Sequence, residues 1–177
     1  MFYTKAQALI LTKRIAFGLR TKFGIGLSGP GKDVVSVIAS GQTLSPILFY
    51  GIIAAGGVYS PSNLSSTAAD LARQIRQGNS RLIVCSHDTK GIAVEAASSC
   101  GVPTSRILML QSRPARRLTT LDNDIDVISD QEMDWERITD QEQLESTLVC
   151  LLYSSGTSGL PKGMYGKRFE VPFVDRR

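Results

Sequence analysis

Histidine and cysteine, which supply many metal ligands and catalytic nucleophiles, are scarce in this chain. Its 177 residues include one histidine, His87, and three cysteines, Cys85, Cys100 and Cys150. His87 has no partner histidine for a metal ion and belongs to no nucleophile pattern, so we expect a surface or packing role. The cysteines are odd in number, widely spaced and without a C-x-x-C pair, which argues against a disulfide framework or a zinc site. They are typical of reduced, mostly buried thiols in an intracellular, cytoplasmic protein.

Long hydrophobic runs are also missing. The two longest apolar stretches, residues 46–58 and 148–153, are too short or too interrupted by glycine to cross a bilayer. The first residues enter a helical pattern directly, without the charged region, apolar stretch and cleavage site of a secretory signal. The final Asp175-Arg176-Arg177 is not a peroxisomal tripeptide. We therefore expect no membrane span and no secretory leader.

Charge of one sign is not strongly in excess, since the formal net charge is +4 at pH 7. Seven of the 20 basic side chains gather in two places, Arg113, Arg116 and Arg117 in one, and Lys167, Arg168, Arg176 and Arg177 in the other. Neither group is interleaved with aromatic residues or forms a known recognition motif, so nucleic acid is not an expected partner. The apolar content of 42% is typical of a globular domain with a hydrophobic core.

Apolar residues recur at helical spacing in some stretches and form short β-branched runs in others. Helices are predicted after a cap at Thr4, over residues 43–55, after a cap at Ser66 or Thr67, and over 89–99. Between and after these helices, short apolar strands are predicted at residues 34–38, 81–85, 106–110 and 148–153. This alternation predicts an α/β fold with a mostly parallel sheet flanked by helices.

Residues 111–145 break the alternation, because basic residues are followed by a run of acidic ones. Paired carboxylates can indicate acid/base or metal chemistry. Here they alternate with Ile125 and Val127 in an otherwise polar stretch, so we expect a solvated surface segment. The lone Trp135 is expected to anchor a short element within it.

A glycine-rich turn near the N-terminus imitates a nucleotide-binding motif. Gly26, Gly31 and Lys32 fit the G-x-x-x-x-G-K part of a P-loop, but Asp33 follows where a magnesium-binding Ser or Thr is needed. The context is also reversed, since a predicted helix precedes the turn and a strand follows it. We therefore interpret this segment as a helix-to-strand turn.

A second glycine-rich stretch has the opposite context. The predicted strand of residues 148–153 runs into Ser154-Ser155-Gly156-Thr157-Ser158-Gly159-Leu160-Pro161-Lys162-Gly163. Glycines let backbone N–H groups approach an anion closely, hydroxyls add donors, and a lysine adds a point charge suited to phosphate. A flexible Ser/Gly surface loop would have the same composition, so composition alone leaves both interpretations open.

The order of residues 153–163 resembles the signature loop of the adenylate-forming enzymes, which include acyl-CoA synthetases, 4-coumarate–CoA ligases and luciferases. Eleven ordered positions match. In that family the loop grips the phosphates of ATP, bound with Mg²⁺, while a carboxylate attacks the α-phosphate. The resemblance implies that the cofactor-binding residues here are Ser154, Ser155, Gly156, Thr157, Ser158, Gly159 and Lys162.

The resemblance extends over nearly the whole chain but over only the first part of a family member. It implies a partial AMP-binding N-terminal domain at residues 1–164, with an incomplete N-terminal subdomain fold, and a divergent tail at 165–177. The family's adenine-binding motif, magnesium-linked pair, most of the acyl pocket and the catalytic lysine lie downstream, so no catalytic residue is assigned here. We expect a truncated relative of ATP-dependent carboxylic acid–CoA ligases that is inactive alone. The alternatives are a non-catalytic nucleotide-phosphate-binding or interaction protein, and a subunit completed by a separate C-terminal half.

Overall fold

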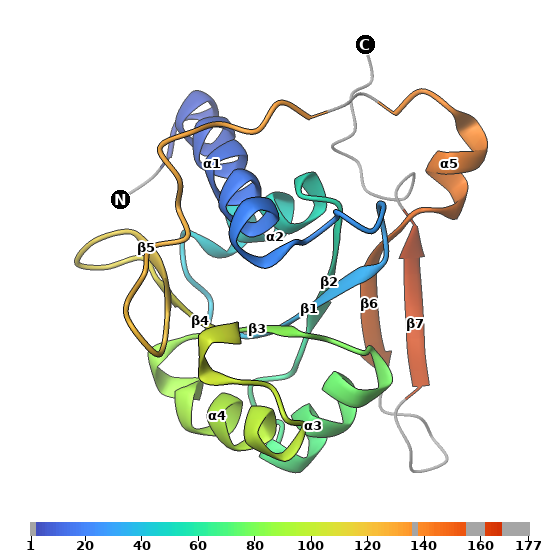
Figure 1. Cartoon of the computed structure of the whole chain (residues 1–177). Helices are drawn as coiled ribbons and strands as arrows, with labels where there is room; N and C mark the ends of the chain where they lie inside the picture. The colour runs from blue at the N-terminus through green and yellow to red at the C-terminus, as the bar shows by residue number, and fades with distance from the viewer. Residues whose placement is uncertain (1–2, 136–137, 155–161, 168–177) are drawn as a thin grey trace.

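The computed structural model describes residues 3–135, 138–154 and 162–167, with the backbone alone for 154 and 162–167. Its centre is a seven-stranded sheet of order β5-β4-β3-β1-β2-β6-β7 (Figure 1). The strands are β1 (Asp33–Ile38), β2 (Gly57–Pro61), β3 (Leu82–Cys85), β4 (Ile107–Gln111), β5 (Arg117–Thr120), β6 (Leu148–Ser154) and β7 (Lys162–Lys167). Strands β1 to β4 and β6 are parallel, whereas β5 and β7 pair antiparallel at the two edges. The predicted α/β class with a mostly parallel sheet is confirmed.

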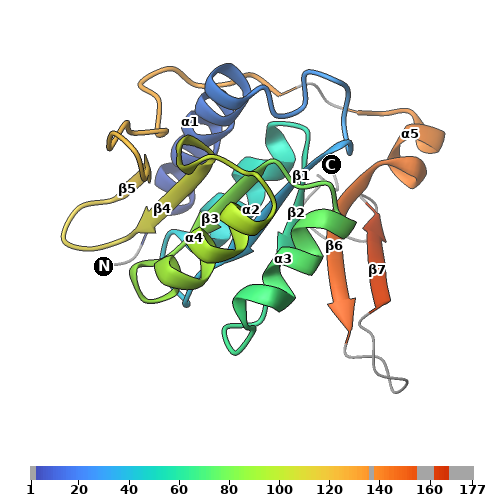
Figure 2. The same ribbon diagram turned by 60° about the horizontal axis from the view of Figure 1, so that its bottom comes forward.

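Helices cover both faces of the sheet. Helices α1 (Lys5–Phe23) and α2 (Ser45–Ala54) lie on one face, and α3 (Ala68–Gln77) and α4 (Lys90–Ser99) lie on the other (Figures 1 and 2). Each face has its own core, one around Ile15, Leu48 and Val35, the other around Leu71, Ile83 and Ala96. Short elements complete the chain, namely η1 (His87–Thr89), η2 (Thr104–Arg106) and α5 (Gln141–Ser146).

Two helix starts follow directly from local sequence chemistry. The side-chain oxygen of Thr4 accepts a hydrogen bond from the backbone N–H of Gln7 at 3.2 Å, and that of Thr67 accepts one from Asp70 at the same distance. In both cases the third helical residue also bonds back to the cap, which forms a capping box. The predicted caps are confirmed, because Thr satisfies backbone donors that a first helical turn leaves unpaired.

The glycine-rich turn between α1 and β1 is a structural turn, as its reversed context predicted. The Asp33 carboxylate accepts a hydrogen bond from the backbone N–H of Gly26 at 2.8 Å, so it caps the turn from within. Gly26 has a φ of +80°, and a Cβ there would lie 1.9 Å from the carbonyl oxygen of Ala55. A side chain at this position would both disfavour the left-handed backbone conformation and collide with the end of α2, so only glycine fits here.

The expectation of a solvated surface for residues 111–145 is wrong for part of that segment. Residues 117–120 form the edge strand β5, and Leu118 and Val127 are fully buried. Val127 donates its backbone N–H to Leu118 at 2.7 Å, and its carbonyl rests on α1 at Gly18. A strand of this kind is stabilised by pairing with β4 and by a distant helix, so its own polar sequence does not reveal it. Ile125 is exposed, as expected.

Candidate functional site

The predicted phosphate-binding loop is set between the two strands of a hairpin. Strand β6 ends at Ser154 and β7 begins at Lys162, and these two residues lie opposite each other in the antiparallel register. The residues between them that were assigned to phosphate, Ser155, Gly156, Thr157, Ser158 and Gly159, lie outside the described residues. The structure therefore brings together the two ends of the loop, and the assignment of all seven residues stays a prediction.

The position of β6 in the sheet sets where this loop emerges. Strand β6 is parallel to β2, with Cys150 beside Tyr59, so both strands run in the direction of β1, β3 and β4. The carboxyl ends of all five parallel strands consequently share one edge of the sheet. In open α/β sheets, ligands bind in crevices beyond this edge.

The strand that leads into the loop is packed against α3. Val149 and Leu151 are buried, 1% and 6% exposed, and the Tyr153 hydroxyl donates to the backbone carbonyl of Gln74 at 3.5 Å. At the end of the helix, a Cβ at Gly78 would lie 3.4 Å from both the Leu151 side chain and the Tyr153 hydroxyl. Leu151 and Tyr153 therefore lie against the end of α3, up to the last residue before Ser154.

Gln74 also holds the carboxyl end of the neighbouring strand. Its side-chain amide donates to the Pro61 carbonyl at 3.5 Å, and its amide oxygen accepts a hydrogen bond from the Ser62 hydroxyl. Through its backbone and side chain together, Gln74 contacts the ends of both β2 and β6. Strands β2 and β6 are thus positioned by the same residue of α3.

A second polar group lies at the same edge, between β1 and β3. The Ser86 hydroxyl accepts from the backbone N–H of Ser40 at 2.9 Å and donates to the Asp88 carboxylate at 2.5 Å. The Ser40 hydroxyl also reaches Asp88, at 3.2 Å, and the Thr89 hydroxyl donates to the Ile38 carbonyl. These bonds join the segments that follow the two strands.

At neutral pH the hydrogen-bonded group of Ser40, Ser86 and Asp88 has a structural role. Hydrogen bonds from the Ser86 hydroxyl, followed by weaker contributions that include Ser40, hold the pKa of Asp88 below its usual value. Asp88 is therefore ionised and engaged as an acceptor. Sequence reasoning missed Ser40, Ser86 and Asp88. The available signal was their position directly after two predicted parallel strands.

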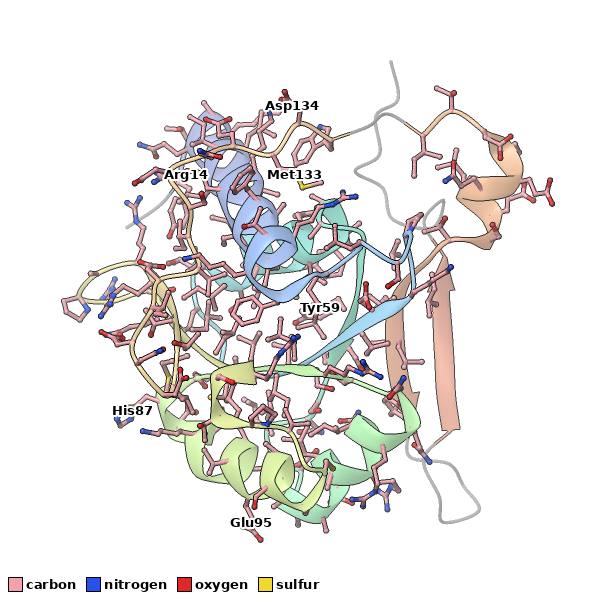
Figure 3. All side chains as sticks on the ribbon, viewed as in Figure 1. Arg14, Tyr59, His87, Glu95, Met133 and Asp134 are labelled. Atoms are coloured by element: carbon pink, nitrogen blue, oxygen red, sulfur yellow. The ribbon has the colours of Figure 1, made fainter. Side chains whose placement is uncertain are left out.

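The buried titratable groups elsewhere do not form a nucleophilic centre. Burial raises the pKa of the Cys85 thiol to about 12, and burial also raises the pKa of Cys150 and of Tyr59. Within the described residues, no three His, Cys, Asp or Glu side chains gather in a way that would hold a metal ion. His87 is exposed at the margin of the molecule (Figure 3), as expected. None of the described helices is both long and apolar enough to cross a lipid bilayer.

Comparison with known protein families places these features in context. The sequence pattern of the AMP-binding enzyme family matches residues 2–167. A protein of Emericella nidulans assigned as an acyl-coenzyme A synthetase is 47% identical over 163 residues, which are 91% of this chain and 29% of the relative. A phenylacetyl-CoA ligase of Aspergillus niger is 32% identical over 158 residues, 88% of this chain and 28% of the relative. The chain thus spans less than a third of the length of these relatives.

Solved structures share the fold. The ATP-bound structure of MatB from Rhodopseudomonas palustris matches with a TM-score of 0.69 and 21% identity, over 92% of this chain and 29% of MatB. An inhibitor-bound N-terminal domain of FACL13 from Mycobacterium tuberculosis matches with a TM-score of 0.66 and 21% identity, over 93% of this chain and 37% of that domain. At this level of identity the likeness concerns the fold.

Proposed function

This chain belongs to the AMP-binding enzyme family, and on that premise we propose that residues 154–162 bind the phosphates of ATP. The observation that carries the proposal is the pairing of Ser154 with Lys162 at the carboxyl edge of the parallel sheet. This pairing closes the glycine- and hydroxyl-rich stretch into a loop at the edge where α/β sheets bind ligands.

The residue types of the loop suit a polyphosphate. Gly156 and Gly159 leave room for backbone N–H groups to approach phosphate oxygens, and the hydroxyls of Ser154, Ser155, Thr157 and Ser158 add donors. Lys162 supplies the positive charge. Magnesium would arrive with the nucleotide and would offset part of the negative charge of its phosphates. The fold likeness to ATP-bound MatB supports this assignment.

For the complete protein we propose the reaction of acid–CoA ligases, because the chain is similar to an acyl-coenzyme A synthetase and a phenylacetyl-CoA ligase. Its substrates would be ATP, a carboxylic acid and CoA, through an acyl-adenylate. Residues 1–177 alone would not form the adenylate. A phosphate loop by itself neither aligns a carboxylate with the α-phosphate nor neutralises the charge that develops there.

Within the chain, residues 1–164 would be the family's partial N-terminal domain and 165–177 a divergent tail. Strand β7 runs across residue 164, and the family pattern extends to 167.

A role as a non-catalytic phosphate-binding or interaction protein is the second candidate. The packing of β6 against α3 favours it, because this packing positions the loop with residues of this chain alone.

Calorimetric titration of the full chain with Mg·ATP tests the binding proposal. Lys162→Ala should weaken binding about tenfold or more, because a charged hydrogen bond contributes about 1.5–3 kcal/mol. Lys167→Ala is the matched control, since Lys167 lies at the opposite end of β7, across from Leu148. Equal losses in both variants, or none in Lys162→Ala, would contradict a phosphate site at residues 154–162.

Pyrophosphate release in the presence of carboxylic acids tests the catalytic part. We expect none from residues 1–177 alone. We expect release when the chain is mixed with a polypeptide comprising the part of the Emericella nidulans relative that lies beyond the matched region. Turnover by the chain alone would overturn the proposal that it needs a complement, while leaving the ATP-binding loop in place.

A further inference from the structure

A pocket of about 580 Å³ opens at the carboxyl edge, between the segments that follow β1, β3 and β4. Strand β1 leads into α2 on one face of the sheet, and β3 leads through η1 into α4 on the other (Figure 2). Because adjacent strands send their helices to opposite faces, the two segments diverge and leave a crevice between them. Ligands of doubly wound folds bind at such topological switch points. The volume is within the range of small-molecule sites.

The walls of this pocket are held by hydrogen bonds between distant segments. One wall is residues 40–43, and Ser40 donates its backbone N–H to Ser86 on the second wall at 2.9 Å. The side-chain amide of Gln42 donates to the Leu110 carbonyl at 3.0 Å, and the backbone N–H of Leu44 donates to the Ser112 hydroxyl at 3.1 Å. The segment of residues 40–44 is thus hydrogen-bonded both to the segment after β3 and to the third wall, residues 109–113. The pocket is therefore formed before any ligand enters it.

The lining combines an apolar part with exposed polar side chains. Met109 and Leu110 come from β4 and supply the apolar part, while Thr43, His87 and Arg113 are exposed side chains around it. Arg113 takes part in none of the ion pairs between described residues. The one carboxylate in the lining, Asp88, already accepts hydrogen bonds from the Ser86 and Ser40 hydroxyls. His87 points outward on the side of the molecule where β4 turns into β5 (Figure 3).

We propose that this pocket binds a small organic anion, with its carboxylate or phosphate on Arg113 and its apolar body over Met109. Arginine presents a planar set of donors that matches either group in two-point contact. Thr43, from the segment of residues 40–43, adds a hydroxyl donor to the lining. The site is separate from the proposed ATP loop, because it lies between β1 and β3 while the loop follows β6, two strand positions beyond β1. It therefore does not depend on the ATP proposal.

Titrations followed by ¹H–¹⁵N correlation spectra of the full chain test this site. The probes are benzoate and phenyl phosphate, with benzyl alcohol as the apolar body alone and inorganic phosphate as the anion alone. We expect saturable shifts at residues 40–43, 86–88 and 110–113 with benzoate or phenyl phosphate. Binding of benzyl alcohol and of inorganic phosphate should each be at least about tenfold weaker. Whichever of benzoate and phenyl phosphate binds more tightly identifies the head group, carboxylate or phosphate, that the site prefers.

The variant Arg113→Gln should weaken the binding of that probe about tenfold, and its exposed position leaves the core intact. Arg81→Gln is the matched control, because Arg81 is also exposed but precedes β3 at the opposite edge of the sheet. Absence of saturable shifts, shifts confined to Tyr153, Ser154 and Lys162 beside the ATP loop, or equal binding by Arg113→Gln would overturn the proposal. Equal binding of inorganic phosphate or benzyl alcohol would also overturn it.

Discussion

The Tyr153 hydroxyl donates to the backbone carbonyl oxygen of Gln74, 3.5 Å away, and so joins the last turns of α3 to the residue before the proposed ATP loop. The side chain of the same Gln74 bonds to the carboxyl end of β2. Gln74 of α3 therefore contacts the carboxyl ends of two neighbouring strands, β2 and β6, at the edge of the sheet where the loop begins. The position of the residue from which the proposed ATP loop begins therefore depends on α3.

Replacing Tyr153 by Phe should lower the free energy of unfolding by about 0.5–1 kcal/mol, because one net hydrogen bond is lost. Urea unfolding measures this loss, and calorimetry should show weaker Mg·ATP binding than in the unmodified chain. Gln74→Ala keeps the carbonyl and removes only the side-chain bonds. Tyr153→Phe should therefore cost the same in the Gln74→Ala background. An unchanged urea midpoint for Tyr153→Phe would mean that the hydroxyl does not stabilise the strand.

Two glycine-to-alanine changes in helices should have opposite effects. At Gly18 in α1, an added Cβ would lie 1.8 Å from the backbone carbonyl oxygen of Val127, so Gly18→Ala must displace the backbone around Val127. We expect it to lower the free energy of unfolding by about 1–3 kcal/mol. At Gly91 in α4, no neighbouring atom lies within 4 Å of the added Cβ. Gly91→Ala should stabilise the chain by up to about 1 kcal/mol through helix propensity.

Thermal unfolding of both variants checks this pair. A Gly18→Ala variant as stable as the unmodified chain would show that residues around Val127 do not rest on α1. The Gly91→Ala variant controls for the general effect of adding a methyl group to a helix.

The glycine-rich turn before β1 should have no part in nucleotide binding. Lys32→Ala should leave Mg·ATP affinity unchanged, because Asp33 turns inward to accept a hydrogen bond from Gly26. Asp33→Ala should instead lower the free energy of unfolding by about 1–2 kcal/mol, since it leaves the Gly26 N–H without its partner. Calorimetry and urea unfolding separate the two effects. Loss of ATP binding in Lys32→Ala would reassign the phosphate site to this turn.

The stability of the chain should fall at alkaline pH through Cys85. Burial raises the pKa of its thiol from about 9 in the unfolded chain to about 12 in the folded one. Between these values the unfolded state loses a proton that the folded state keeps. The free energy of unfolding should therefore fall by about 1.4 kcal/mol per pH unit from this group, and be unaffected by it below pH 9.

Urea unfolding between pH 8 and 11 measures this slope for the unmodified chain and for Cys85→Ala, which should show a shallower one. Cys100→Ala is the control, because it also removes one thiol, from a partly exposed position. The same slope in Cys85→Ala would assign the alkaline loss to other groups.

Most elements of the fold were predictable because their signals are local. The caps at Thr4 and Thr67 and the β-branched run of β1 each involve neighbouring residues only. The ordered match over residues 153–163 indicated the AMP-binding family, to which the chain belongs. Strand β5 was not predictable in this way, because Leu118 becomes a core residue only when it pairs with β4.

The sequence by itself determined the class of the fold, the family and the hydroxyl- and glycine-rich character of the proposed ATP loop, since these reside in composition, period and residue order. Only the tertiary structure decided that β3 returns to the far side of β1, so that Ser40 meets Ser86 and the crevice beside Arg113 opens. It also decided that Gln74 of α3 holds the strand leading into the loop. Strand order depends on contacts between residues far apart in the chain, which no local pattern encodes.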